Sequence, residues 1–132
     1  MYPAARSLVA AVRAAGATPL LLETWAHQAG WPEEQLTFAT MQAAIDDAYG
    51  TIAGDLQVGV APAGQAWQAV VSADPGIVLW QSDGSHPTPA GTFLAACVLY
   101  TRIFGPCPVG GSDTGGLPAT TAATIEAIAN RY

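Results

Sequence analysis

The most conspicuous shortage in this 132-residue sequence is of basic residues, since it contains no lysine and carries a formal net charge of −6. Its four basic side chains are scattered along the chain: Arg6, Arg13, Arg102 and Arg131. A scattered set provides no basic stripe that could neutralise the phosphates of nucleic acid or of anionic lipid. We therefore expect neither nucleic acid nor a membrane to be a partner.

Long hydrophobic runs are also missing. No apolar run reaches the roughly 18 residues that indicate a membrane span. Arg13 interrupts the apolar part of the N-terminal segment, which argues against a signal peptide. These two absences predict a soluble chain.

Charge of either sign is scarce, at 11% of residues against 51% hydrophobic residues. Soluble domains typically contain about 25% charged residues. The length predicts one domain, residues 1–132, with a core of modest size. A composition this apolar predicts more hydrophobic surface than a monomer of this size can bury. We therefore expect part of that surface to lie in an interface with another chain.

Only two cysteines occur, Cys97 and Cys107, and no metal-ligand spacing is present, so we expect neither a metal nor another cofactor. Cys97 lies within the apolar run "FLAACVLY", where a free buried thiol is the usual state. A disulfide with Cys107 remains an alternative, although it would require Cys97 to leave its packed face.

Helical and strand-like segments alternate along the sequence. Apolar residues recur at helical spacing in residues 5–16, 37–56, 63–74, 88–104 and 121–132. The short apolar runs "PLLLETWA" and "QVGVAP" resemble buried parallel strands. The alternation predicts an α/β fold with a parallel sheet of few strands and flanking helices.

One stretch suggests chemistry: "QSDGSHPTPAGTFLAAC", residues 81–97, which places Asp83 and His86 three residues apart on a Gly-Ser turn before an apolar helix. A carboxylate beside an imidazole can fix the ring's tautomer and make it a general base. The spacing alone also fits a capping loop, in which the aspartate forms a turn and the histidine binds backbone groups.

Residues 79–110, "LWQSDGSHPTPAGTFLAACVLYTRIFGPCPVG", resemble the C-terminal block of the SGNH hydrolase superfamily, also called GDSL esterases. Residues 16–27 and 41–67 look like the two preceding strand and helix units of that fold. The resemblance implies a reduced flavodoxin-like (SGNH-type) α/β domain that hydrolyses a small-molecule ester. It implies that His86 is the general base and Asp83 the carboxylate that orients it.

The sequence departs from that family in two blocks. It has no Gly-Asp-Ser nucleophile block, and its only asparagine, Asn130, lies near the C-terminus. The chain therefore resembles a truncated, second half of such an enzyme, with its serine nucleophile unidentified or missing. Activation of water by neutral His86 is one alternative, which predicts slow hydrolysis of activated or short-chain esters. A non-catalytic binding or oligomerisation module is the other.

Ligands of open α/β sheets bind beyond the carboxyl ends of the strands, where the segment after the first strand and residues 82–86 should meet. We expect these two segments to supply the substrate-binding residues Thr24, Trp25, His27 and Ser85. The tryptophans Trp25, Trp67 and Trp80 are most simply core or interface residues, and the pair Asp46-Asp47 the solvated face of its helix.

The first strand also predicts an assembly. It carries one charge, Glu23, and no lysine or internal proline that would protect an exposed edge. We therefore expect a homodimer or a higher homo-oligomer, with the apolar edge or the neighbouring helix faces in the interface.

Overall fold

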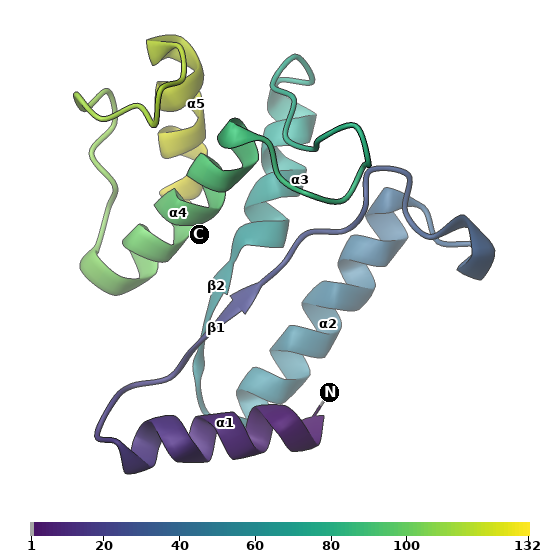
Figure 1. The fold of residues 1–132 in the computed structure, drawn as a ribbon, viewed down its shortest axis with the longest axis vertical. Coiled ribbons are helices and arrows are strands. Elements are labelled where there is room, and N and C mark those ends of the chain that lie inside the picture. Colours follow the sequence, from purple (N-terminus) through teal and green to yellow (C-terminus); the bar gives the residue numbers. More distant parts are fainter. Residues whose placement is uncertain (1) are drawn as a thin grey trace.

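The structure, a computed structural model, describes residues 2–132 (Figure 1). Its elements, in chain order, are α1 (Tyr2–Ala14), β1 (Leu20–Glu23), the 3₁₀ helix η1 (Pro32–Glu34), α2 (Phe38–Leu56), β2 (Gly59–Pro62), α3 (Ala63–Ala73), α4 (Pro89–Phe104) and α5 (Ala119–Ala129). The expected mixture of helices with a small parallel sheet is confirmed. No helix within residues 2–132 has the length and hydrophobicity needed to cross a membrane.

The sheet consists of β1 and β2, which pair in parallel from Leu20 with Gly59 to Glu23 with Pro62. A parallel pair needs a crossover connection, and α2 provides it. The outer edge of β1 has no strand beside it in the described chain, and it faces the viewer in Figure 1.

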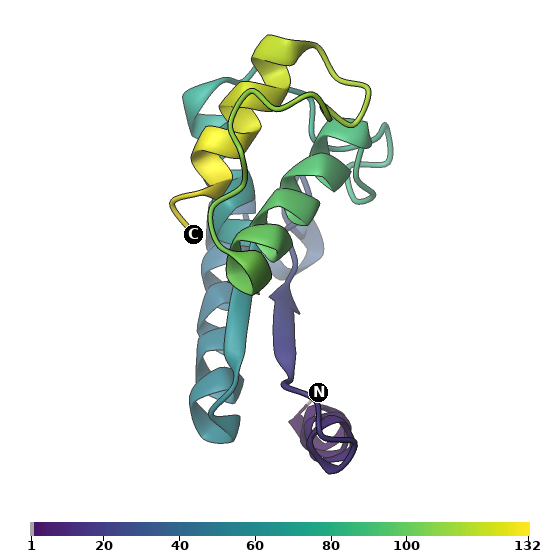
Figure 2. The same ribbon diagram turned by 90° about the vertical axis from the view of Figure 1, so that its left-hand side faces the viewer.

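The helices lie at two levels around the strands. α3, α4 and α5 form the upper part of the molecule in Figure 1, while α1 lies across its lower end and is seen end-on in Figure 2. Arg13 of α1 donates hydrogen bonds to the carbonyls of Leu56 (2.8 Å) and Gln57 (3.0 Å). These are the last carbonyls of α2, where a cation is favoured by the helix dipole.

The hydrophobic core lies between the strands and the upper helices. Its largest fully buried apolar side chains are Trp67, Leu79, Leu94, Ile125, Val70 and Val98. They come from α3, α4, α5 and the segment between α3 and α4, so Leu79 anchors that segment in the core. The prediction that Trp67 and Trp80 are core residues is confirmed.

Side-chain caps explain where two helices begin. Thr37 and Thr40 form a reciprocal capping box at the start of α2. Thr88 caps α4 by accepting a hydrogen bond from Gly91 N (3.2 Å), and its hydroxyl donates to the carbonyl of Val78 (2.7 Å). Thr88 thus starts the helix and also fixes the end of the loop that carries Asp83 and His86.

Two predictions about acidic residues are wrong. Glu23, expected as the charge on an exposed strand, is 1% exposed. Asp46, expected on the solvated face of α2, is half-buried and accepts a hydrogen bond from buried Gln42 (2.7 Å). Asp47 is exposed as predicted. The helical period of the sequence cannot predict that Asp46 is half-buried while Asp47 is exposed. Their burial depends on which polar groups of other elements contact α2.

Gly91 allows α4 to lie against Trp67, because a Cβ at this position would collide with the indole ring and with the carbonyl of Leu79. We predict that Gly91→Ala lowers the free energy of unfolding by about 1–3 kcal/mol, the usual cost of overpacking. Gly50→Ala in α2 is the control, since a Cβ there meets nothing within 4 Å. It should raise stability by roughly 0.5–1 kcal/mol. Urea unfolding of both variants measures the difference, and equal effects would contradict this packing.

Candidate active site

The loop between residues 81 and 88 closes on itself. Gln81 N donates to the carbonyl of His86 (2.8 Å), and Gly84 N donates to the carbonyl of Gln81 (2.9 Å). Gly84 has a φ of 69°, a left-handed conformation that glycine adopts without strain. The turn returns the chain so that His86 lies beside the start of the loop, with Asp83 on the same turn.

Asp83 and His86 are hydrogen-bonded, as the sequence predicts. His86 Nδ1 lies 2.6 Å from Asp83 Oδ2, while Asp83 Oδ1 accepts from the backbone N–H groups of Ser85 (2.9 Å) and His86 (3.0 Å). An ionised carboxylate can only accept, so the proton between the two side chains is on Nδ1. Neutral His86 then presents Nε2 as a free acceptor, which is the tautomer of a general base.

The same hydrogen bonds stabilise the negative charge of Asp83. Donation from Ser85 N, followed by the His86 side chain and His86 N, lowers the pKa of Asp83 from 3.8 to about 2. Because folding lowers this pKa, these hydrogen bonds contribute to the stability of the folded protein above about pH 4. Their contribution is lost as the pH falls towards 2. Asp83 is therefore ionised throughout the range of an ordinary hydrolase assay.

The segment that follows β1 lies against this loop. Trp25 Nε1 donates to the carbonyl of Ser85 (3.0 Å), and Gln28 N donates to the carbonyl of Gly84 (2.8 Å). Behind them, Trp80 Nε1 donates to the carbonyl of Ala26 (3.1 Å). The expectation that these two segments meet beyond the carboxyl end of β1 is confirmed.

A hollow of about 330 Å³ opens beside Asp83, and His86 is not one of its lining residues. These are His27, Ala29, Gly30, Trp31, Pro32, Glu33, Asp83 and Gly84. The rings of His27 and Trp31 stack there with their centroids 6.0 Å apart. The other three expected substrate-binding residues do not line this hollow. Thr24 is exposed, Trp25 stacks on Trp67 with centroids 4.1 Å apart, and Ser85 is half-buried with its N–H bound to Asp83.

The imidazole itself is open to solvent, with 74% of the His86 side chain exposed. Within residues 2–132, no side chain forms a hydrogen bond with Nε2, so no serine is positioned as a nucleophile. Asn130 is bound elsewhere, to the backbone N–H (2.7 Å) and carbonyl (2.9 Å) of Cys107. In the same part of the chain, no cluster of three or more His, Cys, Asp or Glu side chains could hold a metal ion.

Sequence reasoning missed a buried polar network at the carboxyl end of β1. The Glu23 carboxylate accepts hydrogen bonds from Gln65 N (3.2 Å) and Gln65 Nε2 (3.3 Å). Gln42 accepts from Ala26 N (2.8 Å) and donates to Asp46 (2.7 Å). A carboxylate at the end of an apolar strand was the one available signal. This network holds the residues that lead from β1 into the candidate site.

No protein-family model, curated protein or solved structure matches this chain. The candidate site is therefore defined by its own geometry.

Glu23 gives the fold a dependence on pH. Burial, and then the charge of Asp46, raises the pKa of Glu23 from 4.5 to about 7. Because folding raises this pKa, protonated Glu23 contributes to the free energy of unfolding. The contribution is fully present below about pH 4.5 and is lost as the pH rises through about 7. The loss has an upper limit on the order of 3 kcal/mol.

We predict that Glu23→Gln removes most of this dependence and is more stable than the parent at pH 8, measured by urea unfolding from pH 4 to pH 8. The exposed Glu33→Gln in η1 is the control and should follow the parent. A parent whose stability is constant over this range would contradict the buried, protonated Glu23.

Proposed function

We propose that this chain is an ester hydrolase of a reduced SGNH type, in which His86 acts as the general base and Asp83 orients it. One observation carries the proposal: the carboxylate binds Nδ1 of an imidazole whose Nε2 is free. The resemblance of residues 79–110 to the SGNH block, and the small parallel sheet that precedes it, support the assignment.

The chemistry that these two residues can perform is proton transfer. Neutral His86 accepts a proton at Nε2 from water or from a hydroxyl that attacks the ester carbonyl, and later donates it to the leaving alkoxide. Asp83, ionised at every pH of interest, stabilises the imidazolium between these two events. General base catalysis of this kind contributes about 10²–10⁴-fold to a rate.

We expect the turnover to be low. Each donor to a developing oxyanion is worth about 10²–10³-fold, and the chain's one asparagine is bound to Cys107. The hollow beside Asp83, with the stacked rings of His27 and Trp31, would hold a small acyl or alcohol group. Activated, short-chain esters are the substrates that suit such a site.

The alternative is a non-catalytic binding or oligomerisation module. It is favoured by the exposure of His86 and by the absence, within the described residues, of a hydroxyl hydrogen-bonded to Nε2. In that case the Asp83–His86 bond stabilises the loop. Both functions use the same geometry, so an activity measurement must separate them.

We predict that the chain hydrolyses p-nitrophenyl acetate and that His86→Ala reduces its rate to background. Asp83→Asn should reduce it by about 10²-fold or more, because the orientation and charge at Nδ1 are lost. Stopped assays of the purified parent and variants at one pH measure these effects.

Ser72→Ala, far along α3, is the control and should retain the parent's rate. Ser82→Ala and Ser85→Ala test whether a serine of the loop is the nucleophile. Water activation predicts that both remain active. A rate that survives His86→Ala, or no activity in the parent, would refute the hydrolase and favour the module.

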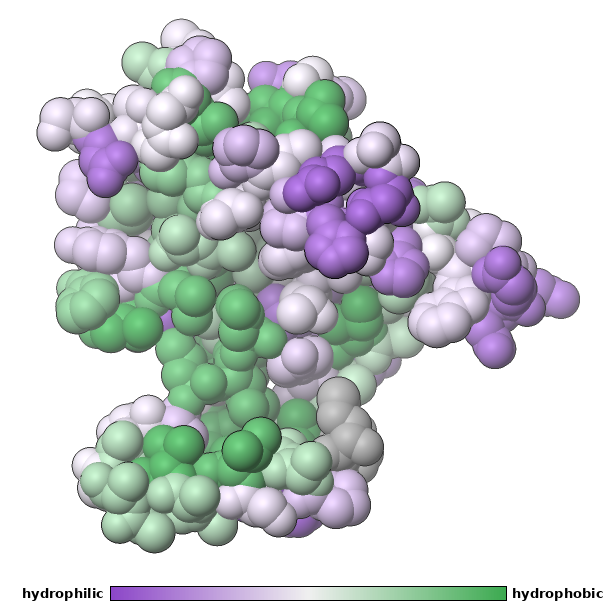
Figure 3. Space-filling model, in the orientation of Figure 1, coloured by the Kyte–Doolittle hydropathy of each residue, from purple (hydrophilic) through white to green (hydrophobic). Residues whose placement is uncertain are grey.

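We further propose that the chain forms a homodimer through the outer edge of β1. Leu22 in this strand is 38% exposed and Leu8 in α1 is 67% exposed. Figure 3 shows hydrophobic side chains gathered over the strands and α1 on the face where that edge lies. Two such edges can pair across a two-fold axis into one continuous sheet, which protects their backbone groups.

We predict a species of twice the 13.5 kDa chain mass in sedimentation velocity at micromolar concentration. Leu22→Lys should shift it to a monomer, because a lysine disfavours edge pairing. Val78→Lys, at an exposed residue between α3 and α4, is the matched control and should remain a dimer. A folded parent at the mass of one chain would refute the dimer.

A further inference from the structure

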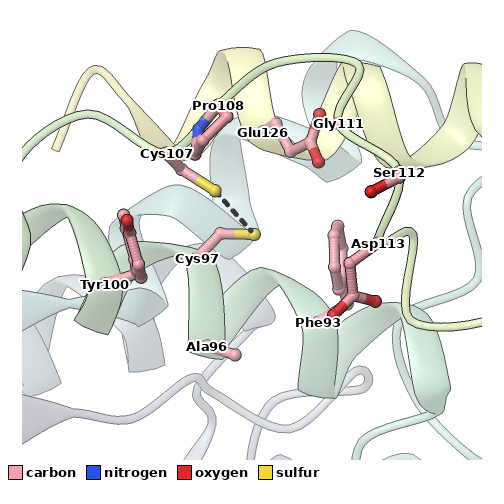
Figure 4. Close-up of a pocket in the computed structure, with 10 residues that line it drawn as sticks. All are labelled: Phe93, Ala96, Cys97, Tyr100, Cys107, Pro108, Gly111, Ser112, Asp113 and Glu126. Atoms are coloured by element: carbon pink, nitrogen blue, oxygen red, sulfur yellow. Dashed lines mark hydrogen bonds between the residues drawn. The ribbon is translucent and has the colours of Figure 1, made fainter.

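The two cysteines lie close together, between α4 and the segment that leads into α5 (Figure 4). Their Sγ atoms are 3.7 Å apart, although the residues belong to different segments. Cys97 lies in the middle of α4 and is 4% exposed, while Cys107 follows the helix and is half-buried. The expectation that Cys97 would have to leave its packed face to reach Cys107 is wrong, because the loop brings Cys107 to it.

The position of Cys107 is fixed by Asn130, the residue that directly follows α5. The Asn130 side chain accepts from Cys107 N (2.7 Å) and donates to the carbonyl of Cys107 (2.9 Å), so both backbone groups are bound. The Thr101 hydroxyl of α4 donates to the side-chain oxygen of Asn130, Oδ1 (3.2 Å). This clamp joins α4, the loop and α5, and it keeps the two sulfurs together without a covalent bond.

Both cysteines line a cavity of about 500 Å³ that opens to solvent, and Cys107 is the more exposed of the two. Its walls come from α4, the 107–113 segment and α5, and Figure 4 shows the two thiols between Tyr100 and Glu126. The remaining lining residues are Phe93, Ala96, Pro108, Gly111, Ser112 and Asp113.

We propose that Cys97 and Cys107 form a reversible dithiol–disulfide couple that exchanges with small-molecule disulfides such as glutathione disulfide. A disulfide needs the sulfurs at about 2.05 Å, so from 3.7 Å each has to move by less than about 1 Å. Rotation of the side chains within the cavity accommodates that change. The couple is independent of the hydrolase activity.

Exchange proceeds in two steps. The Cys107 thiolate attacks one sulfur of glutathione disulfide, whose S–S bond breaks and releases one glutathione thiolate. Cys97 Sγ then attacks the sulfur of Cys107, the mixed disulfide breaks, and the second glutathione leaves with the proton of Cys97. In sum, two protein S–H bonds are replaced by one S–S bond while one glutathione disulfide is reduced to two thiols.

The order of the two cysteines follows from their surroundings. Burial, followed by the hydrogen bond with Cys107, raises the pKa of the Cys97 thiol to about 12, which makes it a poor first nucleophile. Cys107 is the more exposed sulfur and reacts first. Cys97 completes the exchange because Cys107 is held beside it.

The disulfide would fasten α4 to the segment that leads into α5. Residues 105–118, all within the described chain, contain no helix or strand, and their hydrogen bonds to the body include the Asn130 clamp and the bond from Gly110 N to Glu126 (2.7 Å). A covalent link at Cys107 restricts the unfolded chain and limits the opening of this segment. Oxidation should therefore raise the midpoint of thermal unfolding by about 5–10 °C.

The test is equilibration of the full chain in glutathione buffers from reduced to oxidised, followed by acid quenching and intact mass analysis. We expect a single-chain species lighter by two hydrogen atoms. Trypsin cleaves after Arg102, between the cysteines, so the disulfide should join the peptides 14–102 and 103–131 until a reductant separates them. Thermal unfolding of the two forms measures the expected shift in midpoint.

Three variants sharpen the result. Cys97→Ser should accumulate glutathione on Cys107, whereas Cys107→Ser should resist modification because Cys97 is buried. Asn130→Ala should need a glutathione buffer at least about tenfold more oxidising to reach half conversion, since the clamp is lost. Free thiols in the oxidised parent, glutathione retained on Cys107, or a disulfide between two chains would each overturn the proposal.

Discussion

The contacts among three tryptophans, Trp25, Trp67 and Trp80, join the two segments that form the candidate site. The two-stranded sheet alone does not bring these segments together. Trp67 of α3 stacks on Trp25 with centroids 4.1 Å apart and meets Trp80 edge-on at 5.3 Å. Trp25 belongs to the segment after β1, and Trp80 precedes the loop of Asp83 and His86. Each aromatic pair contributes about 0.5–1.5 kcal/mol beyond its buried area. The indole N–H groups of Trp25 and Trp80 then join the two segments through backbone carbonyls.

This cluster has a cost. Trp67 is fully buried, and within residues 2–132 its Nε1 has no hydrogen-bond partner. An unsatisfied buried donor costs about 1–3 kcal/mol, which the ring contacts must offset. The close approach of Gly91 to the indole is part of that compensation, because it lets α4 cover the ring without a Cβ. The contacts of Trp67 with Trp25, Trp80 and α4 thus offset the cost of its unpaired N–H group.

Local patterns predict the helices, the two strands and the Asp83–His86 bond, because each depends on residues close in sequence. The threonines that cap α2 and α4 and the three-residue spacing of the pair are examples. The features that the sequence could not predict depend on pairs of residues that lie far apart in the sequence.

The burial of Glu23 requires Gln65, and the approach of Cys107 to Cys97 requires Asn130. Such partners, 42 and 23 residues away, leave no periodic signal. The hollow beside Asp83 is likewise formed by η1, a short turn without a hydrophobic stripe.

The exposure of His86 bears directly on the proposed activity. An imidazole in water transfers protons, but water also screens the charges that develop in an ester's transition state, and a covered site strengthens every electrostatic contact within it. Under the hydrolase proposal, the catalytic power of this pair therefore depends on what covers the ring when a substrate is bound.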